Sequence, residues 1–438
     1  MTNRIVLYWS IVVALGGFLF GFDTAVISGA EKAIQRLWHL SAYQHGLTMS
    51  IALFGTVVGS LLGGLPADRL GRRTTLFGIA LLYLVSALGS ALATDWYVFM
   101  AFRFLGGLGV GASSVAAPLY ISEVSPPASR GRMVAMFQIN IVAGILVAYL
   151  SNYLLQGLGE GAWRWMLGVQ VVPSIIFAVA LLGIPESPRW LLLKRHDPAT
   201  ALKTLQLIDP ATAQATLAAI ARTEPPPGQR PRLFSAAYRR PVTLVILFAV
   251  FNQVSGINAI IYYAPRIFEL AGLGTSSALL SSAGVGLVNF IFTVSALNVI
   301  DRFGRRVLMR VGSVGLAITL GLVALAFSGN NLGGYTVPVL LFVYIAFFAF
   351  SQGAVIWVFI SEIFPNEIRA EGQALGSFTH WIMATVVTFT FPILTEWVGP
   401  AALFSFFCAM MALQGLFAWR MMPETKNTSL EGSVVVGH

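Results

Sequence analysis

The stretch Gly-Gly-Leu-Pro-Ala-Asp-Arg-Leu-Gly-Arg-Arg at residues 63–73 has a shorter copy, Asp-Arg-Phe-Gly-Arg-Arg, at residues 301–306. Each copy lies between apolar runs that are long enough to cross a bilayer. A second motif also occurs twice, a Ser-Glu pair with an arginine eight residues after the serine, at residues 122–130 and 361–369. Repetition at half-chain spacing predicts two related membrane halves with a binding site between them.

The composition favours a membrane protein. Of the 438 residues, 57% are apolar and 10% are charged, whereas a soluble domain carries about 25% charged residues. The first apolar run is too long for a cleaved signal peptide. The single cysteine, Cys408, excludes an internal disulfide. The net charge of +9 would suit nucleic acid or a membrane surface, and its distribution favours the membrane.

Apolar windows of about 20 residues predict twelve transmembrane helices. These windows fall near residues 8–28, 46–66, 74–93, 97–121, 132–156, 163–184, 241–264, 277–300, 307–327, 336–361, 372–395 and 400–422. The predicted fold is therefore all-α, with twelve helices in two pseudo-symmetric six-helix bundles. We expect an N-terminal bundle over 1–186, a cytoplasmic linker of two or three short helices over 187–239, and a C-terminal bundle with a short tail over 240–438.

The basic residues indicate the orientation of the chain. Of the 27 Lys and Arg, 22 fall in the N-terminus, the C-terminus and the loops after every second span. The alternate loops hold only Lys32, Arg36, Arg164 and Arg266. By the positive-inside rule, both termini are therefore expected in the cytoplasm.

Several motifs together resemble the sugar porter family of the major facilitator superfamily. They are the repeated Asp-Arg-x-Gly-Arg-Arg, Pro-Glu-Ser-Pro-Arg at 185–189, Pro-Glu-Thr-Lys at 423–426 and Gln-Val-Ser-Gly-Ile-Asn at 253–258. The likeness spans nearly the whole chain. Within the family, the sequence resembles bacterial proton–sugar symporters and is similar to facilitative glucose transporters. It implies the major facilitator fold, a bacterial inner-membrane location, a monosaccharide and protons as ligands, a lipid bilayer around a monomer, and no cofactor, metal or nucleic acid.

Asp23 and Arg103 are charged residues inside predicted spans. Asp23 lies roughly 22 Å from the cytoplasmic end of the first span, and Arg103 lies roughly 10 Å below the outer face. In a core about 30 Å thick the two reach nearly the same depth. Because an isolated charge there costs at least ~3 kcal/mol, we expect the two to pair. The resemblance implies the Asp–Arg couple of proton symporters; a static pair that only fixes helix packing is the alternative.

A sugar offers hydroxyls and apolar C–H faces, so its site needs amides and an aromatic plane. The resemblance and the predicted depth together select as substrate-binding residues Phe20, Gln138, Asn252, Gln253, Asn258, Asn289, Trp357, His380 and Trp381. Trp357 is the predicted stacking plane, and Tyr262 and Tyr263 are the predicted outer gate. Each amide taken alone could instead be a hydrogen bond between helices.

Three positions depart from the family pattern. Asn252 replaces the usual first glutamine of a Gln-Gln pair, which shortens that side chain by one methylene. Ala354 replaces a common proline after Gly353, so we expect a less kinked tenth span. His380 stands where relatives have Gln or Asn, and its imidazole could contact sugar, titrate near pH 6.5 or simply pack.

The repeated cytoplasmic motifs predict a latch of charged side chains. We expect Asp68 or Asp301 to accept from helix N-terminal amides and from arginines of a neighbouring span. The predicted latch residues are Asp68, Arg72, Arg73, Glu123, Arg130, Glu186, Arg189, Asp301, Arg305, Arg306, Glu362, Arg369 and Glu424. Such a network would hold the inner gate shut and break when the halves rock. The alternative is that these charges are ordinary membrane-side anchors.

Other functions fit the sequence less well. There is no metal-ligand cluster and no nucleophile–base arrangement, which disfavours an enzyme. A non-transporting sugar sensor usually has a long cytoplasmic tail, whereas this chain ends about 15 residues after the last span. The many amides disfavour a drug exporter. A facilitative sugar uniporter remains the main alternative to a proton-coupled importer.

Overall fold

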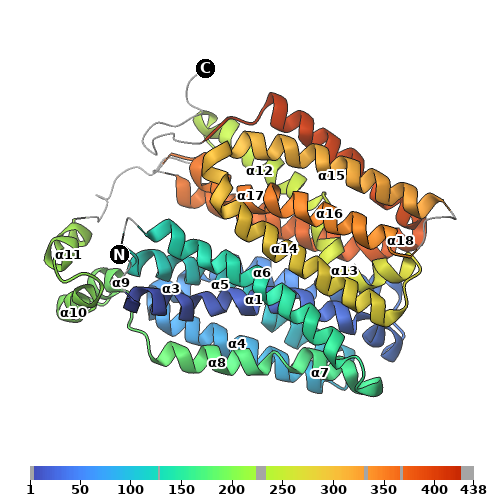
Figure 1. The fold of residues 1–438 in the computed structure, drawn as a ribbon. Helices are drawn as coiled ribbons and strands as arrows, with labels where there is room; N and C mark the ends of the chain where they lie inside the picture. Colours follow the sequence, from blue (N-terminus) through green and yellow to red (C-terminus); the bar gives the residue numbers. More distant parts are fainter. Residues whose placement is uncertain (1–3, 127–128, 223–232, 330–333, 366–367, 426–438) are drawn as a thin grey trace. The chain divides into compact units, whose positions relative to one another are not determined.

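The structure is a computed structural model that describes residues 4–126, 129–222, 233–329, 334–365 and 368–425. The side chains of residues 298 and 301 lie outside this description. Over the described ranges every regular element is a helix (Figure 1).

The chain divides into two compact units. Unit 1 comprises Met1–Val26, Ile51–Ala148 and Gly161–Gly228, and unit 2 comprises Ile27–Ser50, Tyr149–Glu160 and Gln229–His438. Three long helices therefore contribute to both units, because the boundaries fall inside them. The domain boundaries expected from the sequence, at 186 and 240, stay a prediction.

The first half of the chain holds six predicted spans and four short helices, α3 and the last three of the series. Its elements are α1 (Arg4–Leu37), α2 (Ala42–Leu62), α3 (Gly64–Leu70), α4 (Arg72–Leu92), α5 (Trp96–Val124), α6 (Arg130–Leu155), η1 (Gly159–Gly161), α7 (Ala162–Gly168), α8 (Val171–Leu182), α9 (Pro188–Leu193), α10 (Pro198–Ile208) and α11 (Ala213–Ala221). The last three lie where the sequence predicts short linker helices.

The second half holds the other six spans. Its elements are η2 (Ala236–Tyr238), α12 (Arg239–Gln253), α13 (Ile257–Leu270), α14 (Thr275–Phe303), α15 (Arg305–Ser328), α16 (Thr336–Phe350), α17 (Gln352–Glu362) and α18 (Arg369–Arg420). Across the described residues, 11 helical stretches are long and apolar enough to cross a membrane. One of them, the 52-residue α18, bends at Gly399, where φ is 78°, and so contains the last two predicted spans. The predicted fold class is confirmed.

Close contact between α2 and α5 depends on small residues. A Cβ atom at Gly59 of α2 would fall on the carbonyl oxygen of Leu108, and one at Gly107 of α5 would fall on that of Ala52. Small residues at such contacts are typical of helices that pack in lipid. This contact fixes the position of α5, the helix that carries Arg103.

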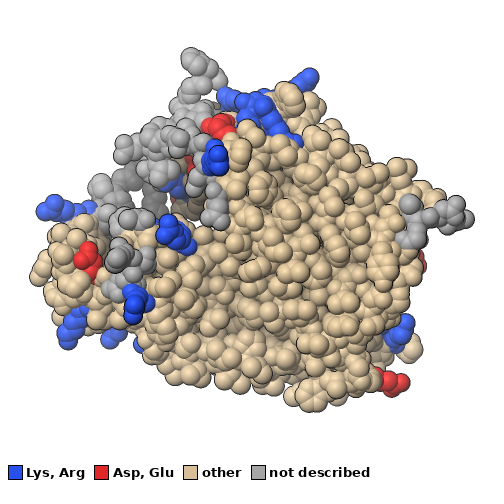
Figure 2. All heavy atoms as spheres, in the orientation of Figure 1, with Lys and Arg blue, Asp and Glu red and all other residues tan. Residues whose placement is uncertain are grey.

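The outward faces of the long helices are apolar. On α15, the side chains of Val311, Val314 and Ile318 are 56–58% exposed, which a water-soluble helix of this composition would avoid. On the face drawn in Figure 2, a broad surface shows no described Lys, Arg, Asp or Glu, and the charged side chains lie at its margins. These faces are suited to hydrocarbon.

The short linker helices pack on one another through a small apolar cluster of Trp190, Leu191 and Ala201. Asp197 begins α10, and its carboxylate accepts the backbone N–H of Thr200 at 3.0 Å. That hydrogen bond holds the pKa of the Asp197 carboxyl below its ordinary value. The linker therefore has regular, capped helices of its own.

Candidate functional site

Asp23 of α1 and Arg103 of α5 meet inside unit 1. Arg103 Nη1 donates to Asp23 Oδ1 at 2.7 Å, and Nη2 donates to the Asp23 carbonyl oxygen at 3.3 Å. Both side chains are 2% exposed. The pairing expected from their similar depth is present, and its role in proton coupling stays a prediction.

The surroundings of this ion pair are polar but incompletely bonded. In the part of the chain that the structure describes, Arg103 Nε and the Ser86 hydroxyl of α4 are buried without a hydrogen-bond partner. Gly106 lies beside the carboxylate, since a Cβ there would be 3.5 Å from Asp23 Oδ1. Replacing a buried pair as a whole can cost little, but separating its two charges in place is costly, so release of Asp23 by Arg103 requires a change of charge on one of them.

Four polar side chains form what we call the amide cluster of unit 2: Asn252, Gln253, Asn258 and His380. Gln253 Nε2 donates to Asn252 Oδ1 at 2.9 Å, and Asn258 Nδ2 donates to Gln253 Oε1 at 2.5 Å. Gln253 Nε2 also lies 3.2 Å from each ring nitrogen of His380. Asn252 Nδ2 is buried with no partner among the described residues, so the cluster still has a donor for a ligand.

Two indoles lie against the amide cluster. The Trp357 ring is 4.9 Å from the His380 ring and 6.5 Å from the Trp381 ring, measured between centroids. His380 and Trp381 meet edge to face, with an interplanar angle of 88°. Trp357 is half-buried, so one apolar face remains available beside hydrogen-bonding groups. This is the combination that a sugar ring requires.

A break between α12 and α13 positions the amides. Gly256 adopts φ of 85°, a left-handed conformation that glycine accepts without strain. The Tyr344 hydroxyl of α16 donates to the Ser255 carbonyl oxygen at 2.9 Å, which satisfies part of the interrupted backbone. Gln253 ends α12 and Asn258 is the second residue of α13, so both amides flank the break. Broken helices of this kind are typical of ligand sites in transporters.

Three other residues are predicted ligand contacts: Asn289, Phe20 and Gln138. Asn289 of α14 accepts from the Thr293 hydroxyl at 3.3 Å within its own helix. Phe20 is 9% exposed on α1, and Gln138 is half-buried on α6. Phe20 and Gln138 belong to unit 1, and their place in one common site with unit 2 stays a prediction.

The predicted gate tyrosines are buried in unit 2. The Tyr263 hydroxyl donates to the Thr388 carbonyl oxygen at 3.0 Å, and its ring stacks on Phe391 with centroids 4.8 Å apart. Tyr263 has non-helical φ and ψ of −123° and 18°, so α13 is kinked at this residue. Tyr262 is 2% exposed. A kink at a buried tyrosine is compatible with a gate, and the gating role stays a prediction.

A cluster of charges lies at the first copy of the repeated motif, in unit 1. Arg72 binds Glu123 through two hydrogen bonds, from Nε at 3.0 Å and from Nη2 at 3.1 Å. The Glu186 carboxylate accepts the backbone N–H groups of Arg72 and Arg73, at 2.9 Å and 3.0 Å. It therefore caps the N-terminus of α4, where the helix dipole favours an anion. Ser187 donates to Glu123 at 2.5 Å and closes the network.

The same arrangement recurs at the second motif, in unit 2. Arg305 binds Glu362 from Nε at 3.1 Å and from Nη2 at 2.8 Å. Glu424 accepts the N–H groups of Arg305 and Arg306, at 2.9 Å and 3.0 Å, and so caps α15. Thr425 takes the part that serine has in the first copy, with its hydroxyl 2.6 Å from Glu362. The repeat seen in the sequence is thus a repeat of geometry.

Some latch expectations need correction. The N-terminal amides of α4 bond to Glu186 and not to Asp68, whereas the expected contact between Asp68 and an arginine is present, with the Arg72 guanidinium at 3.1 Å. The reason is that Asp68 lies on α3, whereas Glu186 approaches the end of α4 from the chain after α8. The Asp301 side chain lies outside the described residues. Arg130, Arg189 and Arg369 make no ion pair with another described residue; Arg369 donates to the Phe364 carbonyl oxygen at 3.2 Å.

The tenth span is broken, although Ala354 led us to expect a straighter helix. Ser351 has φ of −116° and ψ of −88° and separates α16 from α17. Its hydroxyl donates to the Phe347 carbonyl oxygen at 2.6 Å, so the break is stabilised without proline. The sequence gives no clear sign of this break, because neither Gly nor Pro occupies position 351.

The apolar windows do not predict two buried polar groups. Gln352 donates to Gln414 at 2.6 Å between α17 and α18. Glu31 and His45 form a fully buried pair, with His45 Nε2 2.7 Å from Glu31 Oε2. Glu31 was outside the first predicted span, which ended near residue 28, whereas α1 continues to Leu37. Ser28-Gly29 stands at the end of the predicted span and favours a boundary there, so the sequence gives no clear sign that the helix continues to residue 37.

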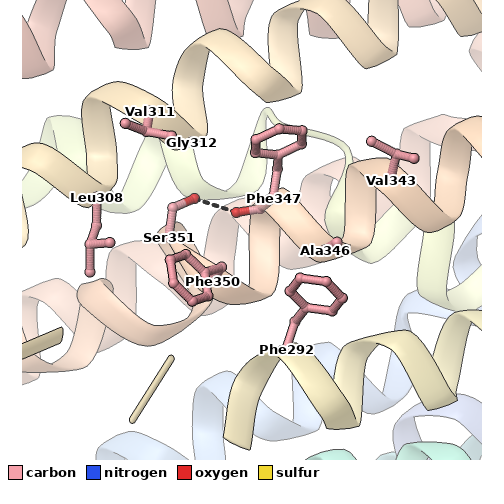
Figure 3. A pocket seen from close by; sticks show the side chains of 9 residues that line it. All are labelled: Phe292, Leu308, Val311, Gly312, Val343, Ala346, Phe347, Phe350 and Ser351. Atoms are coloured by element: carbon pink, nitrogen blue, oxygen red, sulfur yellow. Dashed lines mark hydrogen bonds between the residues drawn. The ribbon is translucent and has the colours of Figure 1, made fainter. Parts of the chain in front are cut away.

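A cavity of about 460 Å³ lies among α14, α15 and α16. Figure 3 shows that its lining is formed by Phe292, Leu308, Val311, Gly312, Val343, Ala346, Phe347, Phe350 and Ser351. Its one hydroxyl, on Ser351, is already bonded within the helix. The cavity therefore suits hydrocarbon and not a sugar. Among the described residues, no three His, Cys, Asp or Glu side chains are grouped so that they could hold a metal ion.

Comparison with known proteins gives one consistent result. Residues 9–435 match the family described as "Sugar (and other) transporter". The arabinose-proton symporter of Bacillus subtilis (strain 168) is 39% identical over 431 residues, which cover 96% of this chain and 93% of the relative. The D-xylose-proton symporter of Escherichia coli (strain K12) is 33% identical over 463 residues, which cover 96% and 94%.

Solved structures agree with the sequence relatives. The inward-open conformation of the xylose transporter XylE from E. coli matches with a TM-score of 0.87 at 31% identity, covering 97% of this chain and 98% of that one. The proton:xylose symporter XylE bound to 6-bromo-6-deoxy-D-glucose matches with a TM-score of 0.79 at 31% identity, covering 98% of both chains.

Proposed function

Because this chain belongs to the family of sugar transporters within the major facilitator superfamily, we propose that it imports a monosaccharide together with a proton by alternating access. The substrate class is a hexose or a pentose, as the names of the arabinose and xylose relatives suggest. The chain is a transporter and not an enzyme. The buried Asp23–Arg103 pair is the observation that carries the proton part of this proposal.

The proton acts on Asp23. When Asp23 is ionised, Arg103 holds it through the 2.7 Å contact and through the Asp23 carbonyl oxygen. A proton from outside neutralises the carboxylate and weakens both the charge attraction and the strongest hydrogen bond. Arg103 is then released, and the N-terminal helices can move. When the site opens to the cytoplasm, Asp23 loses its proton and the ion pair forms again.

The sugar binds at the amide cluster and the two indoles, together with Gln138, Asn289 and Phe20. The Gln253 amide nitrogen has two N–H groups, with Asn252 and His380 in reach, and Asn258 donates to Gln253. Sugar hydroxyls can replace these contacts one for one, because amides and hydroxyls both donate and accept. Trp357 supplies the apolar plane, and Tyr262 and Tyr263 close the outer side.

The two cytoplasmic charge clusters form the latch of the inner gate. Each joins a span to the chain that follows the bundle, through Glu186 in unit 1 and Glu424 in unit 2. The excess of basic residues at these ends favours cytoplasmic termini in the bacterial inner membrane. We further propose that the protein works as a monomer.

Uptake by purified protein in proteoliposomes tests the proposal. A panel of hexoses and pentoses is offered with the outside acidic, and the internal sugar and the internal pH are followed together. Coupled import predicts accumulation above the outside concentration, with the inside becoming acid only when the right sugar is present. Saturable entry that ignores the pH gradient would select the facilitative uniporter, and sugar binding without entry would select the sensor.

A further inference from the structure

A second buried acid lies two turns beyond Asp23 on α1. Glu31 is 1% exposed and His45 of α2 is 0% exposed, and His45 Nε2 lies 2.7 Å from Glu31 Oε2. Both residues belong to unit 2. An imidazole titrates in water near pH 6.5, and full burial of such a group beside a carboxylate is unusual unless the charges balance.

Arg266 of α13 completes the charge of the pair. Its Nε lies 3.5 Å from Glu31 Oε1, and its Nη2 donates to Gln35 Oε1 at 2.5 Å. One turn away, Lys32 forms an ion pair with Glu269 of the same α13. The end of α1 is thus joined to α13 by two ion pairs, one of them buried with the histidine.

The remaining groups around His45 do not alter this balance. The Tyr263 ring is 6.0 Å from the imidazole and is neutral near pH 7. Arg36 and Glu396 are the other nearby charged side chains, and both are exposed to solvent. With a neutral imidazole, Glu31 balances Arg266 and Glu269 balances Lys32.

A second proton on His45 would upset this arrangement. It would leave one uncompensated positive charge in the buried group. It would also place an N–H on Nδ1, which is buried and has no hydrogen-bond partner among the described residues. Burial of such a donor and of an unbalanced charge is unfavourable. The arrangement in which α1 and α2 contact α13 therefore binds one proton fewer than an arrangement in which water reaches His45.

Water can approach this group from one side. A cavity of about 290 Å³ is lined by Gln35, Ala42, Arg266, Leu270, Phe391 and Glu396, among others. Arg266 both lines this cavity and contacts Glu31. A small movement of the guanidinium would therefore connect the buried pair to the cavity, and through it to protons from that side of the membrane.

We propose that the Glu31–His45 pair is a second proton-binding site, separate from Asp23, and that proton uptake by His45 releases the ends of α1 and α2 from α13. Because the hydrated arrangement binds one more proton, acid shifts the population toward it, by at most about tenfold per pH unit. The distribution of basic residues puts these ends outside. We identify this release with opening of the outer gate, and only that identification rests on the proposed transport function.

Hydrogen–deuterium exchange of the full-length protein in detergent or nanodiscs tests the proposal. Exchange in peptides that cover residues 38–50 and 262–272 is compared at about pH 6 and about pH 8, with times corrected for intrinsic rates. His45→Gln keeps an N–H donor for Glu31 but does not titrate. The control is His39→Asn, an exposed histidine of the same corner whose φ of 48° asparagine accepts.

The wild type and His39→Asn should exchange at least threefold faster in these peptides at the lower pH, and His45→Gln should lose that difference. An equal acid response in His45→Gln, or no acid response in the wild type, would overturn the proposal. If His45→Gln does not fold, His45→Asn replaces it and the wild-type result still decides. This measurement needs neither sugar nor Asp23, so it fails or succeeds independently of the proposed transport function.

Discussion

Replacement of Asp23 by Asn should abolish uphill sugar uptake. Coupling through the ion pair alone means one proton per sugar, because the pair has one titratable carboxylate. A tenfold ratio corresponds to about 1.4 kcal/mol, which is also the free energy of one proton across one pH unit. A gradient of two pH units therefore supports accumulation of about 100-fold in the wild type. In the Asp23→Asn variant the internal sugar should stop at about the external concentration.

The structure also predicts a stability effect that has to be separated from the coupling effect. Arg103 is 2% exposed, and the substitution leaves its charge buried without a carboxylate. Removal of one partner of a buried ion pair costs about 3–5 kcal/mol, a large part of the stability of an ordinary domain of about 5–15 kcal/mol. The double variant Asp23→Asn/Arg103→Gln removes both charges and should recover most of this loss. It should nevertheless remain uncoupled.

The assay uses proteoliposomes with an internal pH dye and labelled sugar. Two readings are taken from each preparation: accumulation under an imposed pH gradient, and exchange of labelled for unlabelled sugar without a gradient. Exchange reports folded, sugar-competent protein, because it requires no net proton movement. Glu160→Gln is the matched control, since Glu160 is an exposed carboxylate near α7.

Coupling through Asp23 predicts lost accumulation with preserved exchange in Asp23→Asn and in the double variant. Accumulation close to 100-fold in either of them would refute the reasoning and would reduce the ion pair to a packing contact. Loss of both readings in the single variant, with recovery of both in the double variant, would lead to the same conclusion. The control should behave as the wild type throughout.

The other predictions concern the sugar site, the latch and helix packing. His380→Gln should change the sugar Kd by about three- to tenfold and reorder the sugar preference, because a buried hydrogen bond is worth about 1 kcal/mol; an unchanged ranking in a binding assay would exclude His380 from the site. Glu186→Gln should lower the free energy of unfolding in detergent by about 2 kcal/mol, because a charged cap of α4 is lost. Glu424→Gln should give a similar loss at α15, and unequal effects would argue against equivalent caps. Gly107→Ala should destabilise by about 1–3 kcal/mol through overpacking on α2, whereas Gly78→Ala, with open space around it, should be neutral or stabilising.

The ion pair in the membrane could be predicted from the sequence because lipid leaves a buried charge few options. Asp23 and Arg103 are separated by 80 residues, and no local pattern links them. Depth in the bilayer supplies the link, since span order and direction place both at a similar height. The same reasoning could not predict that both side chains are 2% exposed or that Arg103 Nε has no partner among the described residues, because these properties depend on how α1, α4 and α5 pack.

The repeated motifs predicted which charged residues gather, but not which acid each arginine binds. Arg72 binds Glu123 and Arg305 binds Glu362, at equivalent positions of the half-chain repeat. The helix caps could not be derived in the same way. Asp68 is closer in sequence to α4, yet Glu186 reaches the amides, because the chain returns to that helix end only after three further spans. A contact between residues so distant in the sequence cannot be predicted from a local pattern.

The Glu31–His45 pair shows what an apolar window does not detect. A window ends where charge appears, so it stopped α1 about nine residues before Leu37. Burial of Glu31 is a property of three helices, because His45 and Arg266 lie on α2 and α13. Each of these residues alone is typical of a loop or a helix end. Only their contact makes them a buried charged group.

The two units have the same chemistry at the repeated motifs and different chemistry at the buried polar sites. Glu186 and Glu424 cap equivalent helices in both, whereas the described members of the amide cluster in unit 2 are all neutral side chains or an imidazole and the ion pair belongs to unit 1. A proton changes the charge of its site, and a sugar does not. A direct contact between the two ligands would require a carboxylate among the amides, and the described cluster has none. In the proposed cycle, coupling therefore depends on movement of the helices. The charge of Asp23 determines which arrangement of the helices is favoured, and the amide cluster around Gln253 binds sugar in one of these arrangements.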